Sequence, residues 1–127
     1  MKITRTRDAS GCIVHLSETS PTEGRLIEGD LYGDFTVSER VLPIRERLAP
    51  VHPPLIIGIA TNYREHIQEM GAAFPEFPVF FIKMPGSLQD PGKPVLLPRQ
   101  LRSEKVDFEA ELAVVLKRTC RNLSETE

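Results

Sequence analysis

Three acidic residues alternate along one short segment near the carboxyl end of the sequence. Asp107, Glu109 and Glu111 are separated by single uncharged residues, Phe108 and Ala110. Residues two apart in a β-strand project from the same face, so the three carboxylates would lie side by side. Like charges at this spacing need solvent or a cation between them. A solvated acidic face is the common case, and a cation here would be a hard ion such as Mg²⁺, Mn²⁺ or Ca²⁺.

A second pair of residues could carry out proton transfer. His66 and Glu69 are three residues apart, so they would share one face of a helix. A carboxylate beside a histidine can fix its tautomer and raise its basicity, which is an arrangement that suits a general base. A surface ion pair is the alternative interpretation of the same spacing.

The elements that must position these groups can be read from the apolar pattern. Continuous apolar runs predict buried strands at residues 55–60 and 79–83, a short third strand at 95–97 and a long fourth strand at 107–117. Asn62 offers a helix cap and Gly71 a stop, which predicts a short helix over residues 63–70. A polar helix that directly follows a buried strand resembles a mobile lid over a site.

The first part of the chain predicts a different unit. Closely spaced turns and short apolar runs in residues 1–50 are typical of a small antiparallel β unit. Several prolines between residues 43 and 54 indicate a connector. We therefore expect two units, residues 1–54 and residues 55–127.

Composition excludes some classes of function. The 127 residues carry 16 basic and 18 acidic side chains, a net charge of −2, so we expect no nucleic-acid partner. We expect no membrane partner either, because no apolar run is long enough to span a bilayer, and no secretory signal begins the chain. The expected location is cytoplasmic. Cys12 and Cys120 lie far apart without a histidine pattern, so we interpret them as buried thiols and not as zinc ligands.

Four motifs occur in one order in the second unit and together resemble the fumarylacetoacetate hydrolase family. Residues 58–66 resemble its G-x-x-x-N-Y-x-x-H start, and residues 78–83 its P-x-x-F-x-K strand. Residues 91–98 look like its P-G-x-P loop, and residues 107–115 like its D-Y/F-E-x-E-L-x-V-V metal strand. Residues 1–50 carry no motif of the family.

The resemblance implies a fold, a cofactor and a set of site residues. The fold is α+β, mostly mixed β-sheet arranged as a β-roll, here truncated and preceded by a small amino-terminal β unit. Glu109 and Glu111 are implied as ligands of Mg²⁺, or of Mn²⁺ or Ca²⁺, and His66 as the general base with Glu69 as its partner. Tyr63 and Lys83 are implied as substrate-binding residues, although Lys83 is equally interpreted as a lysine at a strand end.

The function implied is that of a metal-dependent hydrolase that cleaves C–C bonds of small β-diketo or oxo acids, of the acylpyruvate or fumarylacetoacetate type. A decarboxylase or isomerase of oxo acids from aromatic degradation is the alternative within the family. The implied partners are a small oxo-acid substrate and a second copy of the chain in a homodimer.

The sequence also departs from the family pattern. Met84 stands where many members have proline after the lysine. The third metal ligand of the family, an aspartate in an N-D-x-S/T-A-R-D segment, lies beyond the metal strand and has no counterpart in these 127 residues. We therefore expect the isolated chain to lack part of the site, and an inactive fragment or structural remnant is a further alternative.

Overall fold

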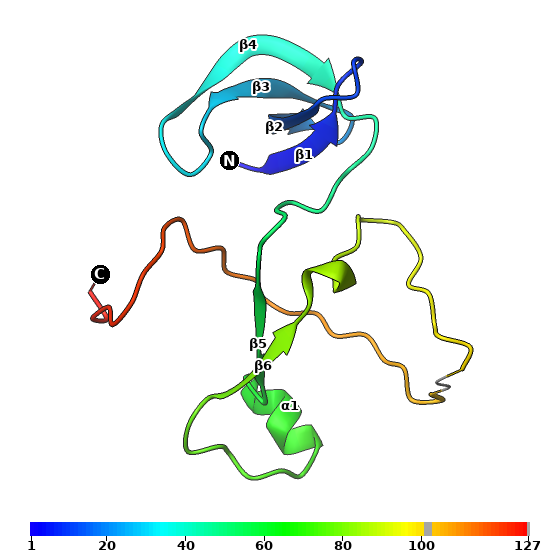
Figure 1. Ribbon diagram of the computed structural model, residues 1–127, viewed down its shortest axis with the longest axis vertical. Coiled ribbons are helices and arrows are strands. Elements are labelled where there is room, and N and C mark those ends of the chain that lie inside the picture. Colours follow the sequence, from blue (N-terminus) through cyan, green and yellow to red (C-terminus); the bar gives the residue numbers. More distant parts are fainter. Residues whose placement is uncertain (101–102, 127) are drawn as a thin grey trace.

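The computed structural model of the protein describes residues 1–100 and 103–126, which form two separate β-sheets and one short helix (Figure 1). The first sheet contains β1 (Ile3–Arg7), β2 (Ile13–Ser20), β3 (Glu23–Gly29) and β4 (Phe35–Pro43). The second contains β5 (Ile56–Ala60) and β6 (Val79–Lys83), and helix α1 (Arg64–Glu69) lies between them in the sequence. A 3₁₀ turn at Pro85–Ser87 follows β6.

The first sheet is an antiparallel meander in the order β1-β2-β3-β4. A two-residue turn connects β2 to β3, and a longer turn after Gly29 connects β3 to β4. Gly29 has a φ of 107°, and a Cβ at this position would lie 2.5 Å from the carbonyl oxygen of Asp34, so the turn requires glycine. The predicted small antiparallel β unit is thus confirmed, while its boundary at residue 54 stays a prediction.

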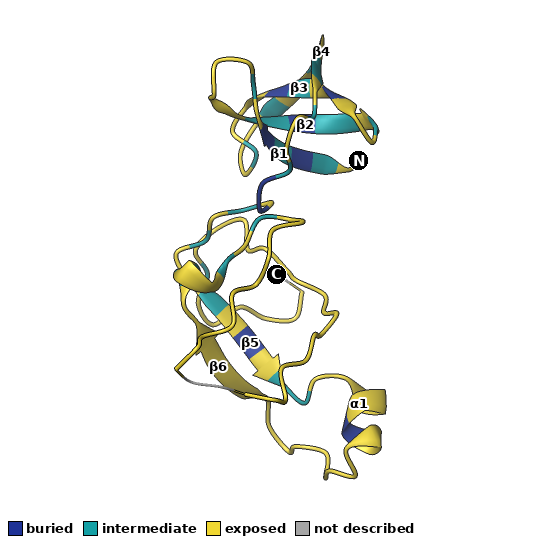
Figure 2. Ribbon diagram, turned by 90° about the vertical axis from the view of Figure 1, so that its right-hand side faces the viewer, coloured by how far each residue is buried: buried dark blue, intermediate teal, exposed yellow. Residues whose placement is uncertain are grey.

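Most of the buried core belongs to this first sheet and to the connector that follows it (Figure 2). Leu16 and Thr6 are fully buried, and Leu48 of the connector is nearly so. The connector is held along β1, because Leu48 N–H donates to the carbonyl of Arg5 at 2.9 Å and the Thr6 hydroxyl donates to the carbonyl of Glu46 at 2.6 Å. The chain therefore leaves the first sheet at a fixed edge.

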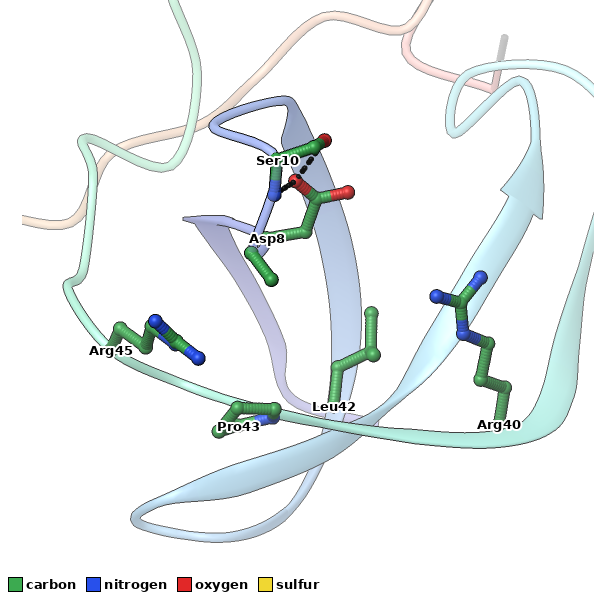
Figure 3. A pocket seen from close by; sticks show the side chains of 7 residues that line it. Asp8, Ser10, Arg40, Leu42, Pro43 and Arg45 are labelled. Atoms are coloured by element: carbon green, nitrogen blue, oxygen red, sulfur yellow. Dashed lines mark hydrogen bonds between the residues drawn. The ribbon is translucent and has the colours of Figure 1, made fainter.

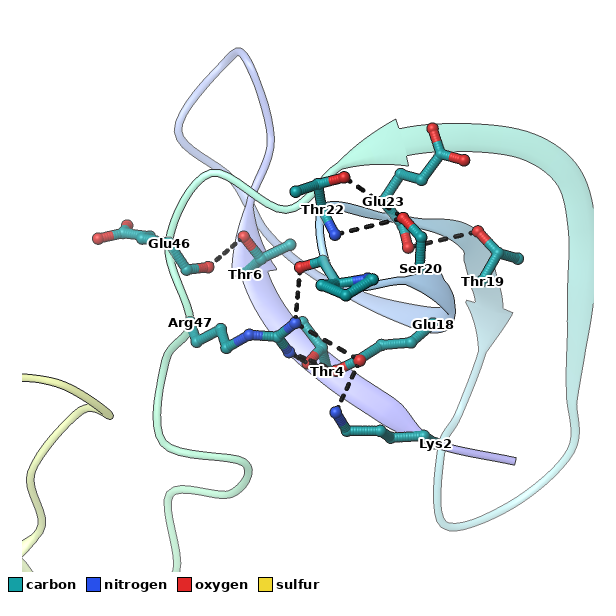
Figure 4. Close-up of polar contacts among 11 residues, drawn as sticks. Lys2, Thr4, Thr6, Glu18, Thr19, Ser20, Thr22, Glu23, Glu46 and Arg47 are labelled. Atoms are coloured by element: carbon teal, nitrogen blue, oxygen red, sulfur yellow. Dashed lines mark hydrogen bonds and ion pairs between the residues drawn. The ribbon is translucent and has the colours of Figure 1, made fainter.

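A carboxylate with several donors ties the connector to the same sheet (Figure 4). The Glu18 side chain is only 7% exposed and accepts from the guanidinium of Arg47, from the Thr4 hydroxyl and, at 2.9 Å, from Lys2. Arg47 also donates to the carbonyl of Pro21 at 2.9 Å. These donors, Arg47 first, lower the pKa of Glu18 to about 2.

This cluster predicts an acid-dependent loss of stability. A carboxylate whose pKa is depressed in the folded state stabilises the fold above its unfolded value, near 4.5, and loses that contribution as the pH falls toward 2. The Glu18→Gln variant should therefore be less stable than the wild type at neutral pH and should show a smaller change in stability between pH 4.5 and pH 2. Urea unfolding followed by circular dichroism at several pH values measures both effects.

The matched control is Glu39→Gln, because the Glu39 side chain is 86% exposed and contacts only Arg25 among the described residues. It should retain the pH dependence of the wild type. If the stability of Glu18→Gln depended on pH as that of the wild type does, Glu18 would not be the source of the acid-dependent loss of stability.

The second sheet is a single antiparallel pair in which Gly58 of β5 faces Phe81 of β6. The Phe81 ring lies over the buried glycine, and a Cβ at position 58 would come within 2.3 Å of that ring. The first glycine of the 58–66 motif is thus needed for cross-strand packing rather than for a turn.

Four details of the predicted elements are wrong. Strands form at residues 56–60 and 79–83, close to the predicted bounds, but they are not buried strands, since every residue of β6 is exposed and only Gly58 of β5 is buried. Residues 95–97 and 107–117 are not strands. Tyr63, not Asn62, is the helix N-cap, and no side chain caps the helix. Cys12 is exposed and Cys120 half-buried, so neither thiol is fully buried.

The failure of the last two strands has one physical cause. A strand forms only where a neighbour takes up its backbone hydrogen bonds. Among residues 1–100 and 103–126, β5 and β6 pair only with each other, so residues 107–117 have no strand beside them and their apolar side chains are exposed.

The fold class is α+β with little helix, as predicted, and all strand pairs among the described residues are antiparallel. The β-roll and the truncation stay predictions. Over the described part of the chain, no helix has the length and apolar character needed to cross a membrane.

Candidate functional site

Helix α1 begins and ends in well-defined backbone geometry. Thr61, with a φ of 51°, turns the chain out of β5, and the extended Tyr63 then precedes the first helical residue. The amide of Gly71, which has a φ of 62°, donates to the carbonyl of Gln68 at 3.0 Å and ends the helix. Ile67 is the only buried residue of α1, so the helix is held by one apolar side chain and leaves its polar residues exposed.

The predicted base and its partner lie on the exposed side of this helix. Nδ1 of His66 lies 3.8 Å from Oε2 of Glu69, which is ion-pair distance but too long for a hydrogen bond. The two side chains are 51% and 79% exposed. The predicted shared face is confirmed, and solvent reaches both groups.

The acidic segment is an extended chain without strand partners. Both Glu109 and Glu111 are exposed, and Asp107 accepts the amide of Phe108 at 2.8 Å. Neither Glu109 nor Glu111 lines the cavities of the amino-terminal unit. The described residues contain no group of three histidine, cysteine, aspartate or glutamate side chains that could hold a metal ion.

One contact connects the helix to the acidic segment. The amide of Leu112 donates to the hydroxyl of Tyr63 at 2.8 Å, across 49 positions of sequence. Tyr63 precedes α1 and Leu112 directly follows Glu111, so two of the sequence motifs meet at this bond. No residue pattern could have indicated this bond, because the partner on the acidic segment is a backbone amide.

Lys83 is not brought to this contact by any described interaction. It is the last residue of β6, pairs with Ile56 and places Nζ 5.5 Å from the centre of the Phe81 ring. This cation–π contact fits a lysine at a strand end, the alternative interpretation of this residue.

Two cavities of the described structure are lined mainly by the amino-terminal unit, and neither is lined by a predicted site residue. The first, of about 270 Å³, is lined on one side by Asp8 and Ser10 and on the other by β4 and the residues after it, including Arg40 and Arg45 (Figure 3). The Asp8 carboxylate accepts from the Ser10 hydroxyl at 2.7 Å, and this bond is the main cause of the lowered pKa of Asp8.

The second cavity, of about 300 Å³, lies where the connector meets β1 and the loop around Pro91. Its wall includes Glu18 and Arg47, which are already paired. Nearby, the amide of Ala49 donates to Asp90 at 2.7 Å and joins that loop to the connector. These contacts fix the connector and offer no group for the predicted reaction.

The chain resembles proteins from several organisms. An uncharacterised protein of Pyrococcus horikoshii is 44% identical over 82 residues, which are 65% of this chain and 35% of that protein. The oxaloacetate tautomerase YcgM of Escherichia coli is 41% identical over 70 residues, 55% of this chain and 31% of that enzyme. The chain thus spans about a third of the length of these two relatives.

A solved structure also shares the fold. A protein of Mycobacterium abscessus, described as putative and uncharacterised, superposes with a TM-score of 0.61 at 31% identity, over 79% of this chain and 40% of that one. The family described as fumarylacetoacetate (FAA) hydrolase C-terminal matches residues 55–127, the part of the chain that carries the four motifs. This protein therefore belongs to the fumarylacetoacetate hydrolase family.

Proposed function

We propose that this protein acts on small oxo acids as a metal-dependent enzyme, with His66 as general base and Glu69 as its partner. The observation that carries the proposal is the hydrogen bond from Leu112 to Tyr63, since it brings the segment of Glu109 and Glu111 to the start of the helix that bears His66. The exposure of His66 supports it, because a base must reach its substrate.

The metal in this proposal is Mg²⁺, Mn²⁺ or Ca²⁺, held by Glu109 and Glu111. Carboxylate oxygens suit these hard ions, so the two residues fit in chemical type. They fit as two ligands and not as a complete set, since the described residues form no group of three. When bound, such an ion would hold the oxygens of the oxo acid and stabilise negative charge on them.

The chain's own part in the reaction is proton transfer. Because Nδ1 of His66 faces Glu69, Nε2 is the atom that would take a proton from the substrate or from water. The Tyr63 hydroxyl uses a lone pair to accept from Leu112 and keeps its proton to donate to a substrate oxygen. Lys83 would offer a positive charge to a substrate carboxylate.

Two reactions are compatible with this chemistry. In tautomerisation of a keto acid, His66 removes a proton from the carbon between two carbonyl groups and a proton is returned at the carbonyl oxygen, which gives the enol. The reverse reaction removes the enol O–H proton and returns a proton at carbon. The E. coli relative is named an oxaloacetate tautomerase, and this favours isomerisation as the first candidate. Hydrolytic C–C cleavage, in which His66 activates a water molecule, is the second candidate, favoured by the description of the matching family. The proposal also includes a homodimer, as the resemblance implies.

An experiment distinguishes the two reactions. It uses an extended protein, which we define as this chain joined after residue 127 to the segment that follows the matched 82 residues in the Pyrococcus horikoshii relative. Ultraviolet absorbance follows the enol of oxaloacetate, and proton NMR follows the products of acylpyruvate cleavage. We expect Mn²⁺-dependent loss of the oxaloacetate enol and slower or no acylpyruvate cleavage. Activity toward neither acid, with or without Mn²⁺, would refute the proposed function.

A further inference from the structure

Tyr63 accepts one hydrogen bond through its backbone carbonyl and another through its side-chain hydroxyl. Its backbone carbonyl accepts the amide of Ile67 at 3.1 Å and so begins the hydrogen bonding of α1. Its hydroxyl, at the far end of the side chain, accepts the amide of Leu112 at 2.8 Å. One rigid aromatic side chain therefore spans the distance between the helix and the acidic segment.

The acidic segment depends on this bond for its position. Residues 107–116 have no strand partner, and in the described part of the chain the bond to Tyr63 is the one hydrogen bond that joins them to another element. Their apolar side chains are largely exposed, so packing adds little restraint. Without the hydroxyl, Leu112 N–H would bond to water and the segment would be free to move relative to α1.

We propose that Tyr63 is a positioning residue that sets Glu111 relative to His66. The proposal rests on the proposed function, in which these two groups act on one substrate. His66 is three residues after Tyr63, about one helical turn, and Glu111 directly precedes the residue whose amide Tyr63 binds. The tyrosine thus joins the base to the carboxylates by a backbone contact, in addition to the substrate binding implied for its O–H group.

The test is amide hydrogen exchange, followed by NMR, in the Tyr63→Phe variant of the 127-residue chain. Phenylalanine keeps the ring and removes only the acceptor. Because the bond is exposed and its net contribution is that of a single hydrogen bond, the Leu112 amide should exchange roughly 2- to 10-fold faster. The first sheet should keep its chemical shifts and the chain its melting temperature, which a general loss of structure would not allow.

Tyr32→Phe is the matched control. Tyr32 is the other tyrosine of the chain, is 40% exposed like Tyr63, and lies in the turn before β4. This variant should leave exchange at Leu112 unchanged. Equal exchange at Leu112 in the wild type and in Tyr63→Phe would overturn the positioning role.

A second measurement keeps this outcome separate from the proposed function. Mn²⁺ broadens NMR signals of nearby groups, so Mn²⁺ bound at the acidic segment should broaden the His66 ring signals in the wild type and less in Tyr63→Phe. Faster exchange at Leu112 together with reduced broadening at His66 supports the proposal. No broadening at Glu109, Glu111 or His66 in the wild type would count against the metal of the proposed function, while the exchange result still decides whether Tyr63 holds the segment. If the His66 signals broaden in the wild type and broaden equally in Tyr63→Phe, the positioning role is overturned even if exchange changes.

Discussion

The 127-residue chain alone is expected to bind Mn²⁺ weakly and to show no measurable turnover of oxo acids. The extended protein is expected to bind Mn²⁺ more tightly and to convert oxo acids. The described residues supply two exposed carboxylates and no group of three ligands. An octahedral ion held by two carboxylates of one segment keeps most of its waters, and Mg²⁺ releases them reluctantly. A third acidic ligand from another segment would add charge and fix the geometry.

Calorimetric Mn²⁺ titration and the two activity assays, made on both proteins, measure this difference. Joining the additional segment should also shield some of the exposed apolar side chains at residues 106–116, which would appear as a rise in melting temperature. Robust metal-dependent turnover by the 127-residue chain would contradict the prediction. Asp107, which lies two residues before Glu109, would then be the first candidate for the third ligand.

The elements that the sequence predicted correctly are those whose partners lie close by in the chain. β5 and β6 are joined by 18 residues, residues 61–78, and both were predicted from apolar runs bounded by turn residues. The helix followed from the polar segment between them that ends at Gly71. Local pattern was sufficient here because each of these elements is completed by a neighbour within the described residues.

The acidic segment shows where local pattern is insufficient. Residues 107–117 alternate like a strand and are apolar enough for burial, yet Phe108 and Leu112 are more than 80% exposed. Alternation records which face a residue would occupy but supplies no partner for its backbone. The shared face of Glu109 and Glu111 therefore stays a prediction about a paired strand, and the roles of both residues stay proposals.

The hydrogen bond of Tyr63 shows a second limit of prediction from sequence. Sequence reasoning marked Tyr63 through a family motif, but the structural role of its hydroxyl depends on the amide of Leu112, and every residue except proline has such an amide. Side-chain patterns cannot indicate a bond of this kind. Only the folded arrangement of both segments reveals it.

In the extended protein, Glu109→Gln and His66→Gln are expected to separate metal binding from proton transfer. Glutamine at position 109 keeps the size of the side chain but removes a charge, so Mn²⁺ affinity and activity should both fall, and most of the activity should be lost. Glutamine at position 66 removes the base and leaves the carboxylates unchanged. It should lower kcat by about 10²- to 10⁴-fold while Mn²⁺ affinity stays near that of the wild type.

The controls for these variants come from the same chain. Glu104→Gln removes an exposed carboxylate just before the acidic segment, and His52→Gln removes an exposed histidine of the connector. Both should retain activity and Mn²⁺ affinity, as measured by the same titration and enol assay. A loss of Mn²⁺ binding in His66→Gln would instead identify this histidine as a metal ligand. Full activity in Glu109→Gln would contradict the metal-ligand role proposed for Glu109 and leave Glu111 and Asp107 as the candidate carboxylates of the segment, since alternation in a paired strand would place all three on one side.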